Sequence, residues 1–563
     1  MNVDEQFPHD TSGQNNPIYS SIDGQRLKVL IEASLAWLKT NQQIVNDLNI
    51  FPVPDGDTGT NMVLTMQAAY NEISSSGEHN VGRMAHAVAQ GALMGARGNS
   101  GVILSQIWRG FARALDNLDT MDTPTFVRAL GEGRNTAYKG IVRPVEGTIL
   151  TVAKDIAAEG EKNLETTTDF FTVLENIVQA ADVSVKHTPE LLPILKQAGV
   201  VDSGGKGLFY IFEGMLRYLK GQSLDIPMAT VQPLSAMTLQ EAKGVIEPGQ
   251  DYEVVVDFTP DHPLDIERFY NELTQFGTSI QVGEGDGMYR MHIHVPTEKR
   301  YYPIDYTMKM GTVTRVMMEN LIAQVQHKQV DALKANKISL ASVEPGQIAV
   351  VAISPGIGIT RIFASLGVAA VVDGGQTMNP STEEILKAFE NLPTDHIIIL
   401  PNNKNIILAA QTASNVTVKN VKIVPCTTIP QGLAAMLRLS PDGDLDKVFK
   451  EMTEAIADVD TGEITIATRS VKMNRVQVKK GEVIALYNGK LVYSASSIEE
   501  ACLGMLAKAN VSERERITLF YGSDLQAMEV NRIADKIRSV YPTHEVELHE
   551  GGQPHYQLIV SIE

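Results

Sequence analysis

The spacing of apolar residues predicts a helical domain in the first part of the chain. Apolar positions recur there at helical intervals, beginning with Leu27, Leu30 and Ile31. Short segments rich in glycine interrupt the pattern. We therefore predict an all-α helical bundle over residues 17–222, preceded by a disordered tail over residues 1–16.

A different pattern follows a segment without clear periodicity. Apolar and polar residues alternate over residues 252–258, 279–282 and 289–295, as expected for strands with one buried face. A helical pattern is predicted over residues 312–325. Together these elements predict a small α+β middle domain over residues 238–326.

The last third of the chain begins with a continuous apolar run at residues 348–353, which is typical of a strand buried on both faces. Shorter runs of this kind then alternate with helical patterns, which favours a doubly wound α/β domain over residues 346–563. Further strands are predicted at residues 369–372, 396–400 and 421–424, and in a second lobe at residues 464–467, 483–486, 490–493, 517–521 and 557–561.

Composition and charge narrow the range of partners. The 563 residues exceed what one core can hold, and the net charge of −19 disfavours both nucleic acid and an anionic membrane surface. An acidic protein can still bind a nucleotide through Mg²⁺, because the ion supplies the positive charge. Two cysteines, no apolar leader and no apolar run long enough to span a membrane lead us to expect a cytoplasmic protein without integral membrane association.

Residues 54–61 carry the first candidate chemistry and read Pro-Asp-Gly-Asp-Thr-Gly-Thr-Asn. Prolines and glycines give this segment a bent backbone, and Asp55 and Asp57 place two carboxylates one residue apart. Mg²⁺ is commonly held by one or two carboxylates together with phosphate oxygens, so the segment indicates a metal–nucleotide site. A solvated Asp-Gly turn is the alternative.

A second candidate is the glycine loop formed by Gly98, Asn99, Ser100 and Gly101, which precedes a strongly apolar helix. Free N–H groups at a helix start, behind small side chains, can bind phosphate. The alternative is an ordinary helix cap provided by Asn99 or Ser100.

Two other glycine-containing segments do not fit nucleotide motifs. A P-loop ending at Lys206 would need glycine at Val200 and a hydroxyl residue at Gly207. Gly204 and Gly205 therefore remain candidates for a lid or a turn. The segment at residues 356–358 lacks the third glycine of a dinucleotide fingerprint, and we interpret it as a tight strand-to-helix turn.

His292 and His294 alternate on a predicted strand, so both point to one face of the sheet. Two imidazoles on one face can share Zn²⁺ if a third ligand approaches. Surface histidines and hydrogen-bonded core histidines are the alternatives.

These segments together resemble a known family, the bacterial fatty acid kinase catalytic subunit. The resemblance extends from about residue 18 to residue 563 in the same domain order. It rests on residues 49–62 (Asn-Ile-Phe-Pro-Val-Pro-Asp-Gly-Asp-Thr-Gly-Thr-Asn-Met), residues 95–106 (Gly-Ala-Arg-Gly-Asn-Ser-Gly-Val-Ile-Leu-Ser-Gln), and residues 201–208, 291–294 and 551–554.

The resemblance implies that the N-terminal domain is similar to the nucleotide-binding subunit of dihydroxyacetone kinase, a helical bundle that holds ADP or ATP through Mg²⁺. Asp55 and Asp57 match metal ligands of that relative, and Asn49 lies nearest to its third Asp, with a one-residue difference in spacing. A histidine of the relative is replaced here by Thr58.

The same resemblance assigns the nucleotide contacts. Ser100 and its neighbours Gly98, Asn99 and Gly101 match the loop that contacts phosphate. Thr60 and Asn61 are implied nucleotide contacts because they lie close to the metal ligands in the sequence.

For the remaining domains, the resemblance implies dimerisation and a zinc site of one Cys and two His in the middle domain. His292 and His294 match the histidines, whereas Glu253 stands where the Cys is expected. The C-terminal domain resembles DegV-like fatty-acid-binding proteins and is implied to recruit such a carrier.

The implied activity is an ATP-dependent kinase that phosphorylates the carboxylate of a fatty acid bound to a separate DegV-like carrier protein. A carboxylate is already ionised at neutral pH, so the reaction requires no general base. The alternatives are a dihydroxyacetone-type kinase, which would act on a hydroxyl group, and a non-catalytic scaffold that binds nucleotide and recruits the lipid carrier.

Overall fold

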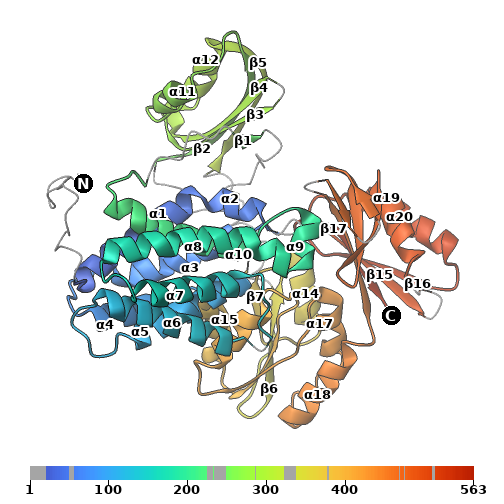
Figure 1. Ribbon diagram of the computed structural model, residues 1–563. Coiled ribbons are helices and arrows are strands. Elements are labelled where there is room, and N and C mark those ends of the chain that lie inside the picture. The colour runs from blue at the N-terminus through green and yellow to red at the C-terminus, as the bar shows by residue number, and fades with distance from the viewer. Residues whose placement is uncertain are drawn as a thin grey trace. The chain divides into compact units, whose positions relative to one another are not determined.

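The structure is a computed structural model that divides into two compact units, Met1–Asp225 with Leu340–Glu563, and Ile226–Ser339 (Figure 1). The predicted tail at residues 1–16 lies outside the described residues, and the domain boundaries stay predictions. The structure describes residues 21–49, 56–141, 143–224, 232–233, 249–285, 287–321, 338–376, 379–467, 470–473, 476–509, 511 and 514–563.

The predicted helical bundle is confirmed. Its helices turn their apolar faces inward, and side chains such as Leu38, Met66 and Leu104 are fully buried in one core. The helices are α1 (Gly24–Thr40), α2 (Gln42–Asp47), α3 (Thr58–Ile73), α4 (Val81–Met94), α5 (Gly98–Arg113), α6 (Thr123–Lys139), α7 (Ile149–Asn163), α8 (Phe170–Leu191), α9 (Pro193–Ala198) and α10 (Ser203–Leu219).

The prediction of a lid or turn at Gly204 and Gly205 is wrong, because both residues lie in the first turn of α10. Asp202 caps this helix by accepting a hydrogen bond from the Gly205 N–H at 2.7 Å. A Cβ on Gly205 would lie 2.7 Å from the Val152 Cγ2 atom of α7, so glycine permits the close approach of the two helices.

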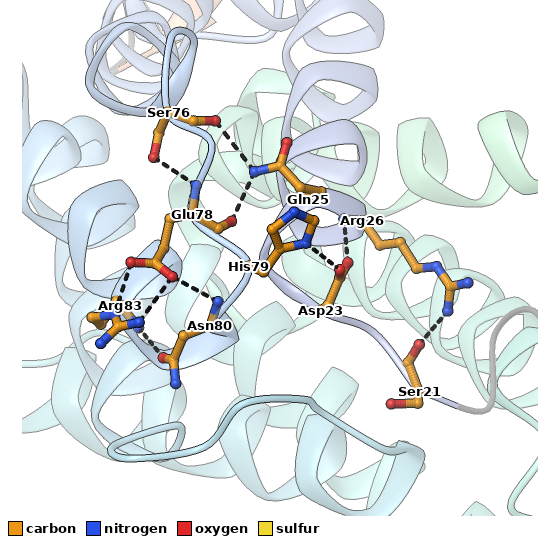
Figure 2. Close-up of polar contacts among 9 residues, drawn as sticks. All are labelled: Ser21, Asp23, Gln25, Arg26, Ser76, Glu78, His79, Asn80 and Arg83. Carbon is orange, nitrogen blue, oxygen red and sulfur yellow. Dashed lines mark hydrogen bonds and ion pairs between the residues drawn. The ribbon is translucent and has the colours of Figure 1, made fainter. Parts of the chain in front are cut away.

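A polar network joins the start of α1 to the segment before α4 (Figure 2). The Asp23 carboxylate caps α1 by accepting from the Arg26 N–H at 3.0 Å, and it contacts His79 Nδ1 at 2.9 Å. Gln25 Nε2 donates to the backbone carbonyl of Glu78 at 2.7 Å. Burial acts to raise the pKa of the Asp23 carboxyl, but the hydrogen bonds from His79 and Arg26 outweigh it and hold that pKa below its usual range.

We expect Asp23→Ala to lower the free energy of unfolding of the helical bundle by about 1 kcal/mol at pH 7, the usual loss for a removed N-cap. Because the folded-state pKa is depressed, the carboxylate stabilises the fold above the unfolded-state pKa of about 4, and this stabilisation is lost as the pH falls through the folded-state pKa. Urea denaturation followed by tryptophan fluorescence tests this, because both tryptophans, Trp37 and Trp108, lie in the bundle. A difference between variant and wild type that stays constant down to pH 3 would argue against it.

The α/β organisation of the last third is also confirmed. Its first sheet is parallel, in the order β7-β6-β8-β9, and every residue of β6 is buried. The elements are β6 (Ile348–Ser354), α14 (Ile357–Ser365), β7 (Ala370–Asp373), α15 (Thr382–Glu390), β8 (His396–Leu400), α16 (Ile407–Ser414), β9 (Asn420–Ile423), α17 (Ile429–Met436) and α18 (Leu445–Ala455).

The second lobe contains a six-stranded sheet in the order β14-β13-β10-β17-β15-β16, in which only the pair β15–β16 is parallel. The elements are β10 (Asp460–Ile466), β11 (Val471–Met473), β12 (Val476–Val478), β13 (Val483–Tyr487), β14 (Lys490–Ala495), α19 (Ile498–Leu506), β15 (Arg516–Tyr521), α20 (Ala527–Val540), β16 (Glu545–Glu550) and β17 (Tyr556–Ile562).

The unit Ile226–Ser339 is built on a sheet in the order β1-β3-β4-β2-β5, and its core includes Phe258, Phe269 and Met291. The elements are β1 (Gln232–Pro233), β2 (Tyr252–Pro260), α11 (Ile266–Leu273), β3 (Thr278–Gly285), β4 (Met288–Val295), the 3₁₀ turn η3 (Thr297–Lys299), α12 (Tyr302–Met308) and β5 (Gly311–Asn320).

The helix predicted over residues 312–325 is wrong within the described residues. Residues 312–320 belong to β5, which pairs antiparallel with β2 at the edge of the sheet. Its β-branched residues, among them Val313 and Val316, suit a pleated strand, and pairing with β2 satisfies the backbone groups. Residues 322–325 lie outside the described part of the chain.

Among the described residues, no helix combines the length and the apolar character needed to cross a membrane.

Candidate functional site

Residues 56–61, the described part of the first predicted loop, lie near residues 98–101, and most of these residues form the first turns of α3 and α5. Thr65 Oγ1 donates to the Asn61 backbone carbonyl at 2.7 Å and accepts from the Arg97 N–H at 3.4 Å. A Cβ on Gly101 would lie only 2.4 Å from Thr65 Oγ1, so the loop at residues 98–101 rests directly on α3. The structure thus brings together Asn61 and the glycine loop, which the resemblance implies separately as nucleotide contacts.

Asp57 is buried at the start of α3, with 6% of its surface exposed. Its carboxylate does not cap α3, and its Oδ2 atom accepts a hydrogen bond from Asn379 Nδ2 at 2.5 Å. A solvated turn therefore does not describe this position. The other predicted carboxylate, Asp55, lies outside the described residues.

The glycine loop presents backbone donors without a side-chain cap. Arg97 occupies the N-cap position of α5 and makes no capping hydrogen bond, while Asn99 and Ser100 lie inside the first turn. The interpretation of Asn99 or Ser100 as the cap is therefore wrong. Because the first N–H groups of a helix have no intrahelical acceptor, this end of α5 can bind an anion.

Gly98 has a left-handed backbone conformation, with φ +56°. A Cβ at this position would lie 2.7 Å from Asn61 Nδ2. Both facts require glycine, because a side chain here would be strained and would displace Asn61.

Thr60 and Asn49 contact α2. Thr60 Oγ1 accepts from Gln42 Nε2 at 2.9 Å and from Asn46 Nδ2 at 3.1 Å, and the Thr60 N–H donates to Asn46 Oδ1 at 3.1 Å. The Asn49 N–H donates to the Asn46 carbonyl at 3.0 Å. Asn46, which the sequence analysis missed, thus fixes α3 against α2.

The start of α10 lies beside the start of α3. Ser203 Oγ donates to Thr58 Oγ1 at 3.3 Å. Burial raises the pKa of the neighbouring Asp202 carboxyl to about 6, even though N–H groups of Gly205 and Ile149 hydrogen bond to it. Sequence reasoning missed Asp202 and Ser203 as neighbours of α3, although the segment that carries them contributes to the family resemblance.

Lys206 does not behave as a phosphate-binding lysine. Its Nζ atom lies 4.0 Å from the centre of the Phe209 ring and 3.7 Å from an Asp182 carboxylate oxygen. These contacts agree with the absence of a P-loop pattern in the sequence.

A second cluster lies in the other unit. His292 and His294 on β4 share one face, with ring centres 5.0 Å apart, as predicted. Glu253 on β2 is buried, and its Oε1 atom is 2.8 Å from His292 Nε2. The three ligand atoms lie within 4.8 Å of one another, and two imidazoles with a carboxylate form a donor set that fits zinc.

Three family profiles match the chain in sequence order. Residues 52–217 match the DAK2 domain, residues 247–328 match the middle domain of FakA-like fatty acid kinase proteins, and residues 349–563 match the C-terminal domain of the same proteins. An uncharacterised protein of Staphylococcus saprophyticus is 37% identical over 554 residues, which cover 97% of this chain and 100% of that protein. The chain belongs to the FakA-like family of fatty acid kinase proteins.

Other relatives of this FakA-like protein match it over the same length. An uncharacterised protein of Staphylococcus aureus is 36% identical over 551 residues, which cover 97% of this chain and 100% of that protein. The matched DAK2 region contains α3, α5 and the start of α10, and therefore the helix starts that form the first cluster described above.

Solved structures resemble parts of the chain. A DegV family protein of Corynebacterium glutamicum is 14% identical, with a TM-score of 0.31, and the match covers 38% of this chain and 96% of that one. The dihydroxyacetone kinase of C. freundii with AMP-PNP and Mg²⁺ is 17% identical, with a TM-score of 0.27 and 38% of each chain covered.

Proposed function

We propose that this chain is a kinase that uses Mg²⁺ and ATP at the start of α3 and α5. The acceptor is the carboxylate of a fatty acid bound to a separate carrier protein, and the products are an acyl phosphate and ADP. The observation that supports this most directly is the buried Asp57 carboxylate beside the uncapped first turn of α5. One feature offers a metal ligand and the other offers phosphate donors.

Phosphoryl transfer depends mainly on positioning and on neutralising charge. Carboxylate and amide oxygens fit Mg²⁺, so we assign Asp57, Asp55 and Asn49 as its ligands. Bound Mg²⁺ would neutralise phosphate charge. The N–H groups of Gly98, Asn99 and Ser100 would hold the phosphates, and the small Gly101 lets α5 approach α3 closely enough to do so.

Side chains of α3 support this arrangement. Asn61 is buried against Gly98 and can orient a phosphate, while Thr60 fixes α3 against α2. A carboxylate acceptor is ionised at neutral pH and needs no base, so the site requires no histidine. The α/β region would recruit the carrier, and the unit Ile226–Ser339 would form a homodimer.

An assay of ADP release under three conditions, two with an acceptor and one without, tests this function. The protein is mixed with ATP and Mg²⁺ and given a carrier loaded with fatty acid, free dihydroxyacetone, or no acceptor. ADP released only with the loaded carrier supports the proposal. Release with dihydroxyacetone would identify a hydroxyl kinase, and nucleotide binding without turnover would identify a scaffold.

We also propose that Glu253, His292 and His294 hold Zn²⁺. The three side chains supply three protein ligands at a compact, half-buried position, and the carboxylate replaces the thiolate expected in this family. The ion would stabilise this sheet by linking β2 and β4.

We expect the purified wild-type protein to contain about one zinc ion per chain and His294→Ala to contain essentially none, because two remaining ligands hold zinc poorly. Elemental analysis by mass spectrometry measures the metal content directly. His262→Ala, which changes an exposed histidine of the same unit, should keep the metal. Equal zinc in both variants, or a wild type without metal after growth in zinc, would contradict the assignment.

A further inference from the structure

The α/β region contacts the glycine loop within the unit Met1–Asp225 with Leu340–Glu563. The Arg97 guanidinium donates from Nη1 to the Asn379 carbonyl at 2.9 Å, and it pairs with the Glu384 carboxylate at 3.0 Å. The Thr382 N–H donates to the Ala96 carbonyl at 3.1 Å. We call residues 379–384 the cover segment.

Apolar packing surrounds these polar contacts. Ala96 and Val102, which flank the glycine loop, are buried in the same cluster as Ile385, Phe389 and Ile406 of the α/β region. The two regions therefore share a continuous piece of core, and the cover segment is held by burial of apolar surface as well as by hydrogen bonds.

The Asn379 amide lies between the Asp57 carboxylate and the start of α5, next to the oxygen that a metal ion bound through Oδ2 would use. Its Nδ2 atom donates to Asp57 Oδ2 at 2.5 Å, and the same atom lies 3.3 Å from the Cβ position of Gly98. A Mg²⁺ ion needs a ligand oxygen at about 2.0–2.1 Å, together with room for phosphate oxygens and water. A Mg²⁺–phosphate group held by Asp57 and the first turn of α5 would therefore have to displace the Asn379 amide from the space that it fills beside both.

The closed arrangement carries a local penalty at Asn379 that partly offsets the contacts holding the cover segment. The other amide atom of Asn379, Oδ1, is buried and has no hydrogen-bond partner among the described residues. A buried acceptor without a donor destabilises the state that contains it. The Arg97–Glu384 pair adds little to offset this, because 49% of the Glu384 side chain is exposed to solvent.

We propose that the cover segment closes the metal–phosphate site within the same chain and withdraws when Mg²⁺ and nucleotide bind. This inference rests on the proposed function, since it takes Asp57 and the glycine loop as the nucleotide site. With closure, the apparent nucleotide affinity equals the affinity of the open form multiplied by the fraction of molecules that are open. A change that weakens the cover without touching the nucleotide site should therefore tighten nucleotide binding.

Isothermal titration calorimetry of the full-length protein with ADP and Mg²⁺ tests the cover. We expect Asn379→Ala to bind about tenfold more tightly than the wild type, because a hydrogen bond to a carboxylate contributes about 1.5 kcal/mol and each 1.4 kcal/mol changes the affinity tenfold. Glu384→Gln should change the affinity in the same direction by a smaller factor. Asn415→Ala, an exposed asparagine of the same region, should bind like the wild type.

Hydrogen exchange gives a second measurement that does not depend on affinity. The Thr382 N–H, which is bonded to Ala96, should exchange faster after ADP and Mg²⁺ are added. Unchanged or weaker binding by Asn379→Ala, or stronger protection of Thr382 with nucleotide, would overturn the cover and leave the proposed function intact. Absence of nucleotide binding in the wild type and in every variant would overturn both.

Discussion

Replacing Asp57 with Asn is expected to reduce ADP formation by about 100-fold or more. The substitution keeps the size of the side chain and removes the buried negative charge that would hold Mg²⁺. Loss of one preorganised electrostatic contact to a transferring group typically costs 10²–10³ in rate. Initial rates of ADP formation with the loaded carrier measure the loss of turnover. Calorimetry with ADP and Mg²⁺ measures the loss of metal–nucleotide binding separately.

Asp116→Asn is the matched control, because this exposed aspartate lies just beyond the opposite end of α5. It should leave rate and affinity unchanged. Circular dichroism must show that Asp57→Asn is folded. A folded Asp57→Asn protein with wild-type turnover would remove Asp57 from the metal site.

The second large effect is expected from Gly98→Ala, which should weaken nucleotide binding at least about tenfold and lower the free energy of unfolding by about 1–2 kcal/mol. The stability loss follows from the left-handed backbone at φ +56°, which costs a non-glycine residue this amount. The binding loss follows because the new Cβ would meet Asn61 Nδ2 at 2.7 Å and displace the first turn of α5. Calorimetry and urea denaturation measure the two effects.

Gly77→Ala separates this local effect from a general cost of replacing glycine. No atom lies within 4 Å of a Cβ built on Gly77, and its backbone does not have a positive φ. This variant should match the wild type in affinity and stability. If Gly98→Ala also binds nucleotide normally, the first turn of α5 does not hold the phosphates.

The helical bundle and the buried strands were accessible to sequence reasoning because long periodic patterns report burial directly. Helix α5 buries one face, and its apolar residues recur at helical spacing. Strand β6 is buried along its whole length, and its residues 348–353 form a continuous apolar run. Strand β5 was mistaken for a helix because Val313, Val316 and Met317 also fit helical spacing, and pairing with β2 decided the outcome. Strand β16 is missed by the sequence analysis, although its residues alternate, because the strand is short and none of its positions is fully buried.

The candidate site was predictable only where its residues are close in the sequence. Asp57, Asn61 and the loop at Gly98 carry their chemistry in short motifs, and the structure brings these three together. The contact of Asn379 with Asp57 joins residues 322 positions apart, and no local sequence pattern predicts such a contact. Ser203 likewise reaches Thr58 only because α10 packs against α3.

In the unit Ile226–Ser339, too, the sequence pattern alone predicted only the ligand residues that are close together in the chain. Alternation placed His292 and His294 on one face, and this was confirmed. Glu253 was matched through the family resemblance, and the antiparallel register of β2 and β4, with Glu253 opposite His294, explains why its carboxylate reaches the histidines.

Trapping of the product with hydroxylamine tests the central claim most directly. An acyl phosphate reacts with hydroxylamine to give a stable hydroxamate, which mass spectrometry identifies. The protein, ATP, Mg²⁺ and a carrier loaded with fatty acid should yield the fatty acyl hydroxamate in an amount equal to the ADP formed, and Asp57→Asn should yield almost none. ADP formation without hydroxamate, or phosphorylated dihydroxyacetone in place of it, would contradict phosphoryl transfer to a carboxylate.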